Sequence, residues 1–438
     1  MHPAQRTIDF EAVLADLPPA DRWPRLRDWL AEHPAELSAF LRERHPILET
    51  PDCVLLSRHA DVVAALERPE VFSVELYKPK MGSYLMTEDR TRRHDEDKAI
   101  MSAVLAREDI AAVRRFVANT AEDIVARAER LDLVNDYGRR VPVAMVQEVF
   151  GLDGVAPGKL IEWSYWNQYS AFRNQHLHVA NDSPEVERSK RRNNVMMGLY
   201  IARLMLRKWW RARVGRPDDD PVTRVLAARF PAEGSLQVLR RGINIGGLLI
   251  GAVETTSEAV AHAVSELGKR PAAFADARRL SLERDTAAFD RLCWEALRQR
   301  PIAPYIMRRL ARDHTFVDAD GTRTELRRGQ TVLCLIASAM FDEAAVPDAA
   351  TFDREREFGS SFHFGHGHHA CLGRDFGMVL VPEMVRQLFR RPGFALGGDI
   401  EYRGKPFPEH FPVTWSAEAP GAPPGAESPG VASGGLVA

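Results

Sequence analysis

Helical periodicity dominates the arrangement of apolar and polar residues along this chain. In long stretches the apolar residues recur every three or four positions, which places them on one face of an α-helix. These stretches cover residues 22–43, 108–130, 185–213, 235–268, 286–299 and 373–391. Segments with the composition of strands are short and cover residues 53–58, 314–317 and 330–337. The pattern predicts a mostly α-helical protein with a small β region.

Turn-forming residues indicate where some of the predicted helices and strands begin or end. The segment "DADGTRTE" at 318–325 has the glycine of a turn. Asp220 precedes Pro221, the order in which a side-chain cap and a proline open a helix. After Trp415 the chain becomes rich in Pro, Gly, Ala and Ser. Such a segment cannot bury enough apolar surface to offset its ordering entropy, so we expect residues 417–438 to be disordered.

Length and charge exclude some classes of protein. A chain of 438 residues has room for one large domain or for two or three smaller ones. Its formal net charge of −2 gives no sign of a nucleic-acid partner. No run of about 20 apolar residues occurs, so we expect no membrane span. The N-terminal segment mixes charged and apolar residues, unlike a secretory signal. We therefore expect a cytoplasmic protein.

The four cysteines lie far apart and show no disulfide framework, which is typical of reduced thiols in a cytosolic protein. Cys53, Cys293 and Cys334 have apolar or mixed neighbours, and we interpret them as packing residues. Cys371 differs from them. It lies in "FHFGHGHHACLG", residues 362–373, which holds four histidines, three glycines and one cysteine.

Cys371 directly precedes a helical pattern, and backbone N–H groups at a helix start favour a thiolate. The glycines let the loop backbone reach the sulfur and let a flat group approach closely. One thiolate without a second cysteine nearby suits an axial haem ligand. Zinc is the alternative, because His366, His368, His369 and Cys371 offer four ligands, although residues this close rarely form a tetrahedral site together. A chance composition is the third interpretation.

The loop matches the cysteine loop of the cytochrome P450 family position for position, as Phe364-Gly365-x-Gly367-x-His369-x-Cys371-x-Gly373. The chain therefore resembles that family. The resemblance implies a cytochrome P450 fold, mostly α with a small β region, as a single domain over residues 1–416. It implies haem b as the cofactor and Cys371 as the axial ligand of its iron.

The same resemblance gives further loop residues a role at the haem. It implies that Phe364 and Gly373 contact the cofactor and that His369 is a propionate partner. His363, His366 and His368 occupy positions that the family pattern leaves free. We interpret these three as ordinary loop or surface residues.

A possible ion network precedes the loop. Glu295 and Arg298 are three residues apart on a helical pattern, so they share a face. This spacing alone is common in helices. Phe352, Asp353 and Arg356 then resemble the arginine segment of the family. The resemblance implies a structural Glu295–Arg298–Arg356 network that holds the cysteine loop on the core.

The apolar stretch 248–264 is interrupted by Gly251, Glu254, Thr255 and Thr256. A threonine-containing core helix would explain this composition. The stretch also resembles the distal helix of the family, and the family pattern reads here as Gly251-Ala252-Val253-Glu254-Thr255. The resemblance implies that Glu254 and Thr255 are catalytic and deliver protons while dioxygen is activated. Ala252 stands where a second glycine is usual.

Basic residues that would face the haem propionates are found in two segments. His94 and Lys98 are four residues apart, where the family usually has His and Arg. Lys98 keeps the positive charge without the bidentate fork of arginine. Arg308 resembles the other propionate-binding arginine, with Arg309 as a near alternative. For all of these basic residues, a solvated surface position is the other interpretation.

The implied reaction is insertion of one oxygen atom from dioxygen into an organic substrate, while the other atom leaves as water. No flavin or iron–sulfur segment is recognised, so we expect electrons from NAD(P)H to arrive through a separate ferredoxin and its reductase. Two alternatives remain. One is a peroxide-dependent or isomerising haem-thiolate enzyme, which often lacks the acid–alcohol pair, and the other is a non-catalytic haem sensor.

The substrate is the least determined part of the function. We expect a small hydrophobic molecule because the candidate pocket walls are aromatic and apolar with a few polar groups. These walls are residues 72–86, 163–178, 243–249 and 302–307. Lys78 and Lys80 could attract a substrate carboxylate, and solvated loop lysines are the other interpretation.

Overall fold

The computed structural model describes residues 8–89, 91–175, 177–178, 183–230, 235–317, 321–359 and 361–416. The segment 417–438, which we expect to be disordered, lies outside these residues. The α-helices are α1 Phe10–Asp16, α2 Pro19–Glu32, α3 Pro34–Arg44, α4 His59–Glu67, α5 Lys78–Met81, α6 Arg92–Leu105, α7 Ile110–Val125, α8 Arg140–Glu148, α9 Pro157–Gln168, α10 Pro184–Arg213, α11 Pro221–Ala227, α12 Ser235–Ala252, α13 Glu254–Gly268, α14 Pro271–Ser281, α15 Ala287–Gln299, α16 Ile336–Ala339 and α17 Arg374–Phe389.

The shorter elements connect these helices. Short 3₁₀ and π turns are η1 Glu75–Tyr77, η2 Leu85–Thr87, η3 Leu133–Gly138, η4 Tyr169–Arg173 and η5 Gly367–His369. The strands are β1 Ile47–Glu49, β2 Val54–Leu56, β3 Phe72–Ser73, β4 Arg130–Asp132, β5 Ile306–Leu310, β6 His314–Val317, β7 Arg323–Leu326, β8 Thr331–Cys334, β9 Ala395–Leu396 and β10 Pro412–Thr414. The expectation of a mostly helical single domain with a small β region is confirmed.

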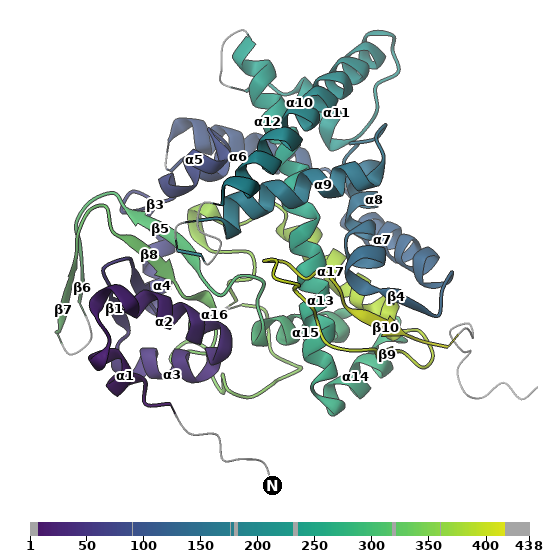
Figure 1. Cartoon of the computed structure of the whole chain (residues 1–438). Coiled ribbons are helices and arrows are strands. Elements are labelled where there is room, and N and C mark those ends of the chain that lie inside the picture. The colour runs from purple at the N-terminus through teal and green to yellow at the C-terminus, as the bar shows by residue number, and fades with distance from the viewer. Residues whose placement is uncertain are drawn as a thin grey trace, which may run out of the picture.

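The strands form three small sheets. The largest has the order β1-β2-β8-β5-β3, in which β2 and β8 are parallel and the other neighbours are antiparallel. Strand β10 pairs with β4 and β9, and β6 pairs with β7. Figure 1 shows the five-stranded sheet with α1 to α4 and α16 on one side of the molecule, and the main helical body on the other.

The helical body is built around α13. Thirteen of its residues are buried, and α13 packs against α15, α17 and η3. Helix α7 covers α17 with a stripe of Val113, Val117, Ala121 and Val125, which recur every four residues on one face. Capping residues fix the helix starts, as Thr91 does for α6 and Asp220 for α11, where Pro221 is the first helical residue as expected.

Two predicted helices are divided in the structure. The stretch 22–43 falls into α2 and α3 because Pro34, at the start of α3, lacks the N–H group that would continue α2 and is accommodated at the start of a new helix. The stretch 235–268 falls into α12 and α13, with Val253 between them. The predicted strand 330–337 ends at Cys334, and the short helix α16 follows. Part of the predicted turn at 318–325 lies outside the described residues.

Three of the four cysteines are buried, in agreement with our interpretation of them as packing residues. Cys53, Cys293 and Cys334 are buried and free. Burial raises the pKa of Cys53 and of Cys334 to about 12, so both remain neutral thiols at physiological pH. Among the described residues, no helix is both long enough and apolar enough to cross a bilayer.

Candidate active site

The cysteine loop is a tight turn that requires glycine at two positions. Gly365 and Gly367 have φ angles of 68° and 64°, in the left-handed region. A Cβ atom at Gly367 would also lie 2.9 Å from the carbonyl oxygen of Leu66. The N–H group of Cys371 donates to the carbonyl of Phe364 at 2.8 Å, which closes the loop. The sequence pattern thus fixes the place of Cys371 directly before α17.

The thiol of Cys371 receives polar support from its surroundings. The Gly373 N–H group donates to Sγ at 3.3 Å, and the charge of Lys98 also favours the thiolate. Cys371 keeps exposed surface, yet the protein around its sulfur raises the pKa of the thiol above its ordinary value of 9.0. The expected thiolate is therefore not produced by the loop alone. A coordinated metal would deprotonate the thiol outright.

Three histidines come together beside the loop. The ring of His94, which is only 1% exposed, lies 4.0 Å from the ring of His368 and 5.0 Å from that of His369. The Nδ1 atom of His94 is 3.2 Å from Asp95, whereas its Nε2 atom is buried without a hydrogen-bond partner. His369 lies 3.8 Å from Asp89. A ligand with acceptor oxygens would satisfy the orphaned nitrogen of His94.

Two of the histidines that we interpret as ordinary loop or surface residues are in fact packed among other side chains. Burial and the neighbouring His94 lower the pKa of His368 to about 4. His363 packs its ring against Trp294 at 5.3 Å, and burial lowers its pKa to about 4 as well. His366 behaves as expected, because its ring pairs with Glu67 at the surface.

Lys98 and Arg308 bring positive charge to the same place. The ammonium group of Lys98 donates to the carbonyl of His368, and burial lowers its pKa. Arg308 is 4% exposed, and its charge contributes to the lowered pKa of His369. Side chains alternate along β5, so Arg309 points to the opposite face and is half-buried there. The structure therefore places Arg308 rather than Arg309 beside the loop.

These donors fit a haem better than a zinc ion. Among the described residues, His94, Asp95 and His368 are the group whose potential ligand atoms lie within 4.8 Å of one another, and Cys371 does not belong to it. The four-ligand zinc site with Cys371 is therefore not formed. A single thiol, an orphaned imidazole nitrogen and the cations Lys98 and Arg308 match a thiolate-ligated macrocycle with two carboxylates.

Helices α12 and α13 meet at the predicted acid and alcohol. The Thr255 hydroxyl donates to the carbonyl of Gly251 at 2.7 Å, so it satisfies a backbone acceptor where the helix is interrupted. Thr255 is half-buried, and a Cβ atom added at Gly251 would meet no atom within 4 Å. Glu254 is 1% exposed. The helix interruption therefore presents the hydroxyl of Thr255 to open space and directs Glu254 into the protein.

Glu254 forms an ion pair that the sequence did not reveal. Its Oε2 atom lies 3.0 Å from Nε of Arg139, while its Oε1 atom is buried without a hydrogen-bond partner. Arg139 also reaches Glu409 at 3.5 Å. Burial raises the pKa of Glu254 to about 7, even though Arg139 opposes that shift. Glu254 is thus a buried acid whose charge changes near neutral pH.

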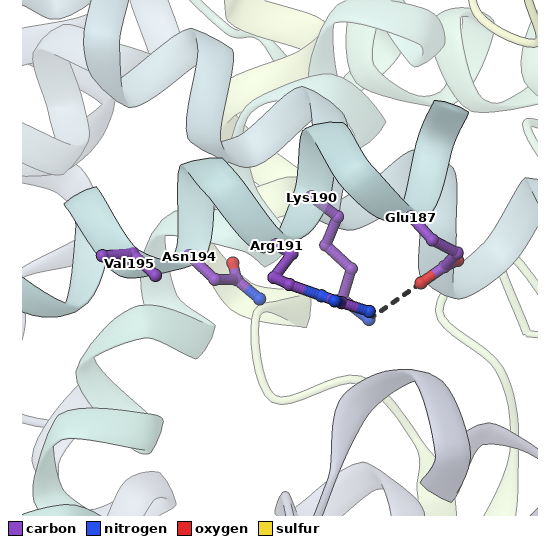
Figure 2. A pocket seen from close by; sticks show the side chains of 5 residues that line it. All are labelled: Glu187, Lys190, Arg191, Asn194 and Val195. Atoms are coloured by element: carbon purple, nitrogen blue, oxygen red, sulfur yellow. Dashed lines mark ion pairs between the residues drawn. The ribbon is translucent and has the colours of Figure 1, made fainter. Parts of the chain in front are cut away.

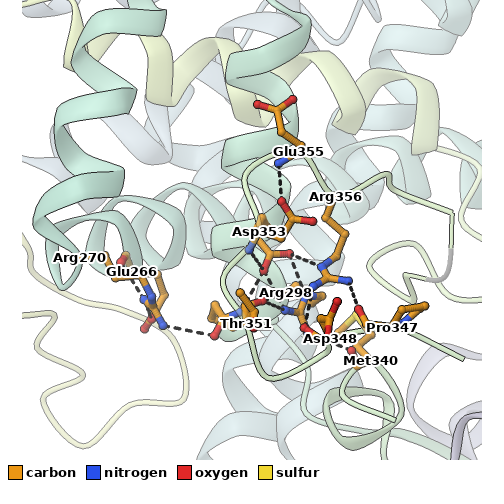
Figure 3. Close-up of polar contacts among 12 residues, drawn as sticks. Glu266, Arg270, Arg298, Met340, Pro347, Asp348, Thr351, Asp353, Glu355 and Arg356 are labelled. Atoms are coloured by element: carbon orange, nitrogen blue, oxygen red, sulfur yellow. Dashed lines mark hydrogen bonds and ion pairs between the residues drawn. The ribbon is translucent and has the colours of Figure 1, made fainter. Parts of the chain in front are cut away.

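In the predicted ion network, Glu295 and Arg298 of α15 meet Arg356, and Figure 3 shows Arg298 and Arg356 among their polar contacts. Arg298 binds both carboxylate oxygens of Glu295 at 2.8 Å, and Nε of Arg356 lies 3.3 Å from Glu295. Arg298 also donates to the carbonyl of Met340, and Arg356 donates to that of Pro347. Through these bonds the network fastens the segment before the cysteine loop to α15.

A cavity of about 430 Å³ opens along α10. It is lined by Glu187, Lys190, Arg191, Asn194 and Val195 (Figure 2). It borders two of the wall segments expected from the sequence, because Glu187 pairs with Lys80 at 2.9 Å and Asn194 accepts from Asn167 at 2.7 Å. Helix α10 itself was not among the expected walls.

One residue of the expected wall 72–86 lies against α12, and one further residue of the site was not identified from the sequence. The hydroxyl of Tyr84 lies so close to Gly247 that a Cβ atom there would be 2.3 Å from it, so Tyr84 covers α12 above the site. Arg139 was not identified from the sequence, because the segment "DYGRRVPV" at 136–143 matches no recognisable motif. Lys78 and Lys80 are paired with Glu88 and Glu187, so neither offers a free charge to a substrate.

The sequence model of the cytochrome P450 family matches residues 285–392, which hold the ion network and the cysteine loop. Cyclomarin C epoxidase of Salinispora arenicola is 29% identical over 365 residues, covering 80% of this chain and 87% of the relative. Linalool 8-monooxygenase of Pseudomonas putida is 24% identical over 381 residues, covering 78% and 84%.

Solved structures agree in fold. The crystal structure of CalO2 superposes with a TM-score of 0.74 at 21% identity and covers 89% of this chain and 97% of that one. EryK from S. erythraea gives a TM-score of 0.72, also at 21% identity, and covers 89% and 97%. The family model, the relatives and the solved structures thus agree with the cysteine loop and its ion network, and together they support a bacterial-type cytochrome P450.

Proposed function

We propose that this cytochrome P450 is a monooxygenase in which Cys371 holds haem b and in which Glu254 and Thr255 control protons. When bound, thiolate-ligated haem supplies the activation of dioxygen and the transfer of one oxygen atom to the substrate, while the other atom leaves as water. One observation carries the proposal. The structure combines a single thiol on a glycine loop with an acid–alcohol pair at an interrupted helix.

Glu254 and Thr255 have different roles in proton transfer. The carboxyl of Glu254, with a pKa of about 7, can give and regain a proton near neutral pH. Arg139 holds one of its oxygens, so the other oxygen is the atom free to exchange the proton. The Thr255 hydroxyl donates to Gly251 and keeps its lone pairs available as an acceptor from water or substrate.

The basic side chains would hold the carboxylates of the macrocycle. We assign this role to His94, Lys98, Arg308 and His369, which lie on three separate segments around the loop. Phe364 and Gly373 would contact the ring system beside Cys371. Phe364 is held in place because its ring fills the space beside Gly377, where a Cβ atom would approach it to 2.6 Å.

Electrons must be supplied from outside this domain. We propose NAD(P)H as their source and a ferredoxin with its reductase as the carriers, in the cytoplasm. The cytochrome P450 fold implies redox partners, which supports this proposal. The peroxide-dependent and sensor alternatives are less well supported, because neither requires a buried acid next to an alcohol.

We propose a small, largely apolar organic substrate. Relatives include an epoxidase of cyclomarin C and a monooxygenase of linalool, which are both organic molecules. The cavity along α10 adds charged and amide groups to the apolar walls. A substrate that reaches this cavity would meet those polar side chains there.

The test supplies the purified holoprotein with NADPH, a surrogate ferredoxin and its reductase. Candidate substrates are first selected by the type I spectral shift. Substrate-dependent NADPH consumption with oxygenated product supports a monooxygenase. Product formation with peroxide alone identifies the peroxide-dependent enzyme, and binding without any turnover identifies a sensor.

A further inference from the structure

Helix α10 carries large apolar side chains on its outer face. Val195, Leu199, Leu206 and Trp210 are 58–65% exposed. They follow one another at steps of four, seven and four residues, so they lie along one line of the helix. Trp209, 53% exposed, borders that line. These five residues are called the α10 ridge below.

The opposite face of α10 makes the contacts with the core. Gly242 of α12 lies against Ile201 and Met205, and Gly246 lies against Ile201 and Met197. From Gly242 to Gly246 along α12, the contacted residues on α10 move back from Met205 to Met197. The two helices therefore run antiparallel. The ridge therefore faces away from α12 and is not covered by the part of the chain that the structure describes.

The first turns of α12 extend the exposed apolar surface. Leu236, Val238 and Leu239 are 55–60% exposed. Because the helices are antiparallel, this end of α12 lies toward the same end of the molecule as Trp209 and Trp210. Figure 1 shows α10 and α12 together at the end of the molecule opposite α1 to α3.

The charge of α10 contrasts with that of the whole chain. The helix has nine lysines and arginines and two glutamates, a formal charge of +7, whereas the chain has −2. Some of these cations pair with acids, as Arg207 does with Asp153. The exposed arginines without an acidic partner among the described residues are Arg188, Arg191, Arg192, Arg203 and Arg213. They share the outer side of α10 with the ridge.

We propose that the α10 ridge and its arginines bind the surface of a membrane that contains anionic lipids. A helix with Trp and Leu on one side and arginines beside them is typical of segments that lie in the interface of a bilayer. Tryptophan prefers the headgroup level, and arginine reaches lipid phosphates from there. A single projecting helix is convex, and a fluid bilayer needs no matching groove to receive it.

A second copy of this chain fits the surface less well. Two ridges packed antiparallel would bring Arg188 and Arg192 of one copy toward Arg213 and Arg211 of the other. Like charges at such a contact are unfavourable, and no exposed acidic cluster on α10 compensates them. A lipid surface instead supplies mobile anions along the whole helix.

The cavity along α10 shares Arg191 and Val195 with this side of the helix (Figure 2). Membrane binding through the ridge would therefore hold the mouth of the cavity near the lipid surface. The binding itself does not depend on the proposed reaction.

The experiment measures co-sedimentation of the holoprotein with vesicles. One set contains phosphatidylcholine with about one third phosphatidylglycerol, and the other contains phosphatidylcholine alone. We expect binding to the anionic vesicles, weakened by salt because surface charges are screened. The double variant Trp209→Ser/Trp210→Ser and the triple variant Arg188→Gln/Arg192→Gln/Arg203→Gln should each bind about tenfold more weakly or worse.

Leu282→Ser is the matched control, because Leu282 is 59% exposed on another part of the surface. It should bind like the wild type. The haem spectrum of each variant shows that it is folded. The proposal is overturned if the wild type binds neither vesicle, if the variants bind as well as the control, or if the ridge variants abolish a dimer while vesicle binding is absent. Capture of an acidic protein without vesicle binding also overturns it.

Discussion

Arg139 and Glu254 form a buried ion pair in which Nε lies 3.0 Å from Oε2, directly where α12 gives way to α13. The arginine comes from the end of η3, more than a hundred residues earlier in the chain. Its charge stabilises the carboxylate of Glu254, while burial favours the neutral acid, and the balance leaves the pKa of Glu254 at about 7. The pair therefore sets the proton affinity of the acid that we assign to catalysis.

The raised pKa of Glu254 predicts a pH dependence of stability. Between its ordinary value of 4.5 and about 7, the folded protein binds more protons than the unfolded chain. Stability is therefore present below about pH 4.5 and is lost as pH rises through about 7, by roughly 3 kcal/mol in total, because one pKa unit corresponds to about 1.4 kcal/mol. Urea denaturation at several pH values should show this loss in the wild type. Glu254→Gln should lack that component, and an identical slope in both proteins would contradict the assignment.

Thr255→Ala should uncouple electron use from product formation. Removing the hydroxyl leaves substrate and cofactor contacts in place, but general acid–base groups typically contribute about 10²–10⁴-fold to a rate. The ratio of product to NADPH should fall steeply, and peroxide should rise. Thr255→Ser retains the hydroxyl and should keep most of the coupling. Unchanged coupling in the alanine variant would make Thr255 only a helix residue that caps Gly251.

Glu295→Ala should be strongly destabilising. It leaves Arg298 and Arg356 without their shared carboxylate, and breaking a buried pair in this way costs about 3–5 kcal/mol. We expect haem-poor or insoluble protein. Arg354→Gln breaks a surface ion pair with Asp276 nearby and should change stability by less than about 1 kcal/mol. The haem content and melting temperature of both variants test the contrast.

Cys371→His should abolish the red-shifted Soret band that the reduced, carbon monoxide-treated protein gives when a thiolate is the ligand. Cys334→Ala removes a buried thiol of the five-stranded sheet and should retain that band. A protein that contains zinc and shows no haem absorbance would refute the assignment of the cofactor.

Arg308→Leu and Arg309→Leu provide a matched pair on one strand. Arg308 is buried beside His369, whereas Arg309 lies on the other face of β5. Transfer of haem to apomyoglobin should be faster from Arg308→Leu and unchanged for Arg309→Leu. Equal rates in the two variants would show that neither arginine holds the cofactor.

Much of this architecture is encoded in local sequence. The four-residue spacing of Val113, Val117 and Ala121 predicts α7, and the glycines at 365 and 367 predict the tight cysteine loop. The break at Pro34 was missed because the apolar period continues across it, whereas the polar interruption around Glu254 was noted without predicting that the helix divides at Val253. Periodicity reports which face is buried and does not report where the backbone changes direction.

The parts of the site that escaped prediction depend on contacts between distant segments. Arg139 meets Glu254 only after η3 has packed against α13, and no spacing in the sequence anticipates this. His368 occupies a free position of the family pattern, yet the fold packs its ring against that of His94. Arg308 and Arg309 could be distinguished only when the register of β5 with β8 was known.

The interruption at Val253 also divides one long helix into two segments that differ in local stability. In α13 nearly every residue is buried, whereas α12 begins with side chains that are largely exposed. Local opening requires far less free energy where few apolar contacts hold a segment. Amide hydrogens of the first turns of α12 should therefore exchange with solvent deuterium long before those of α13. The helix interruption would then appear as a sharp step in the exchange profile, with slow exchange along α13, which packs against α15 and α17, and rapid exchange at the outer end of α12.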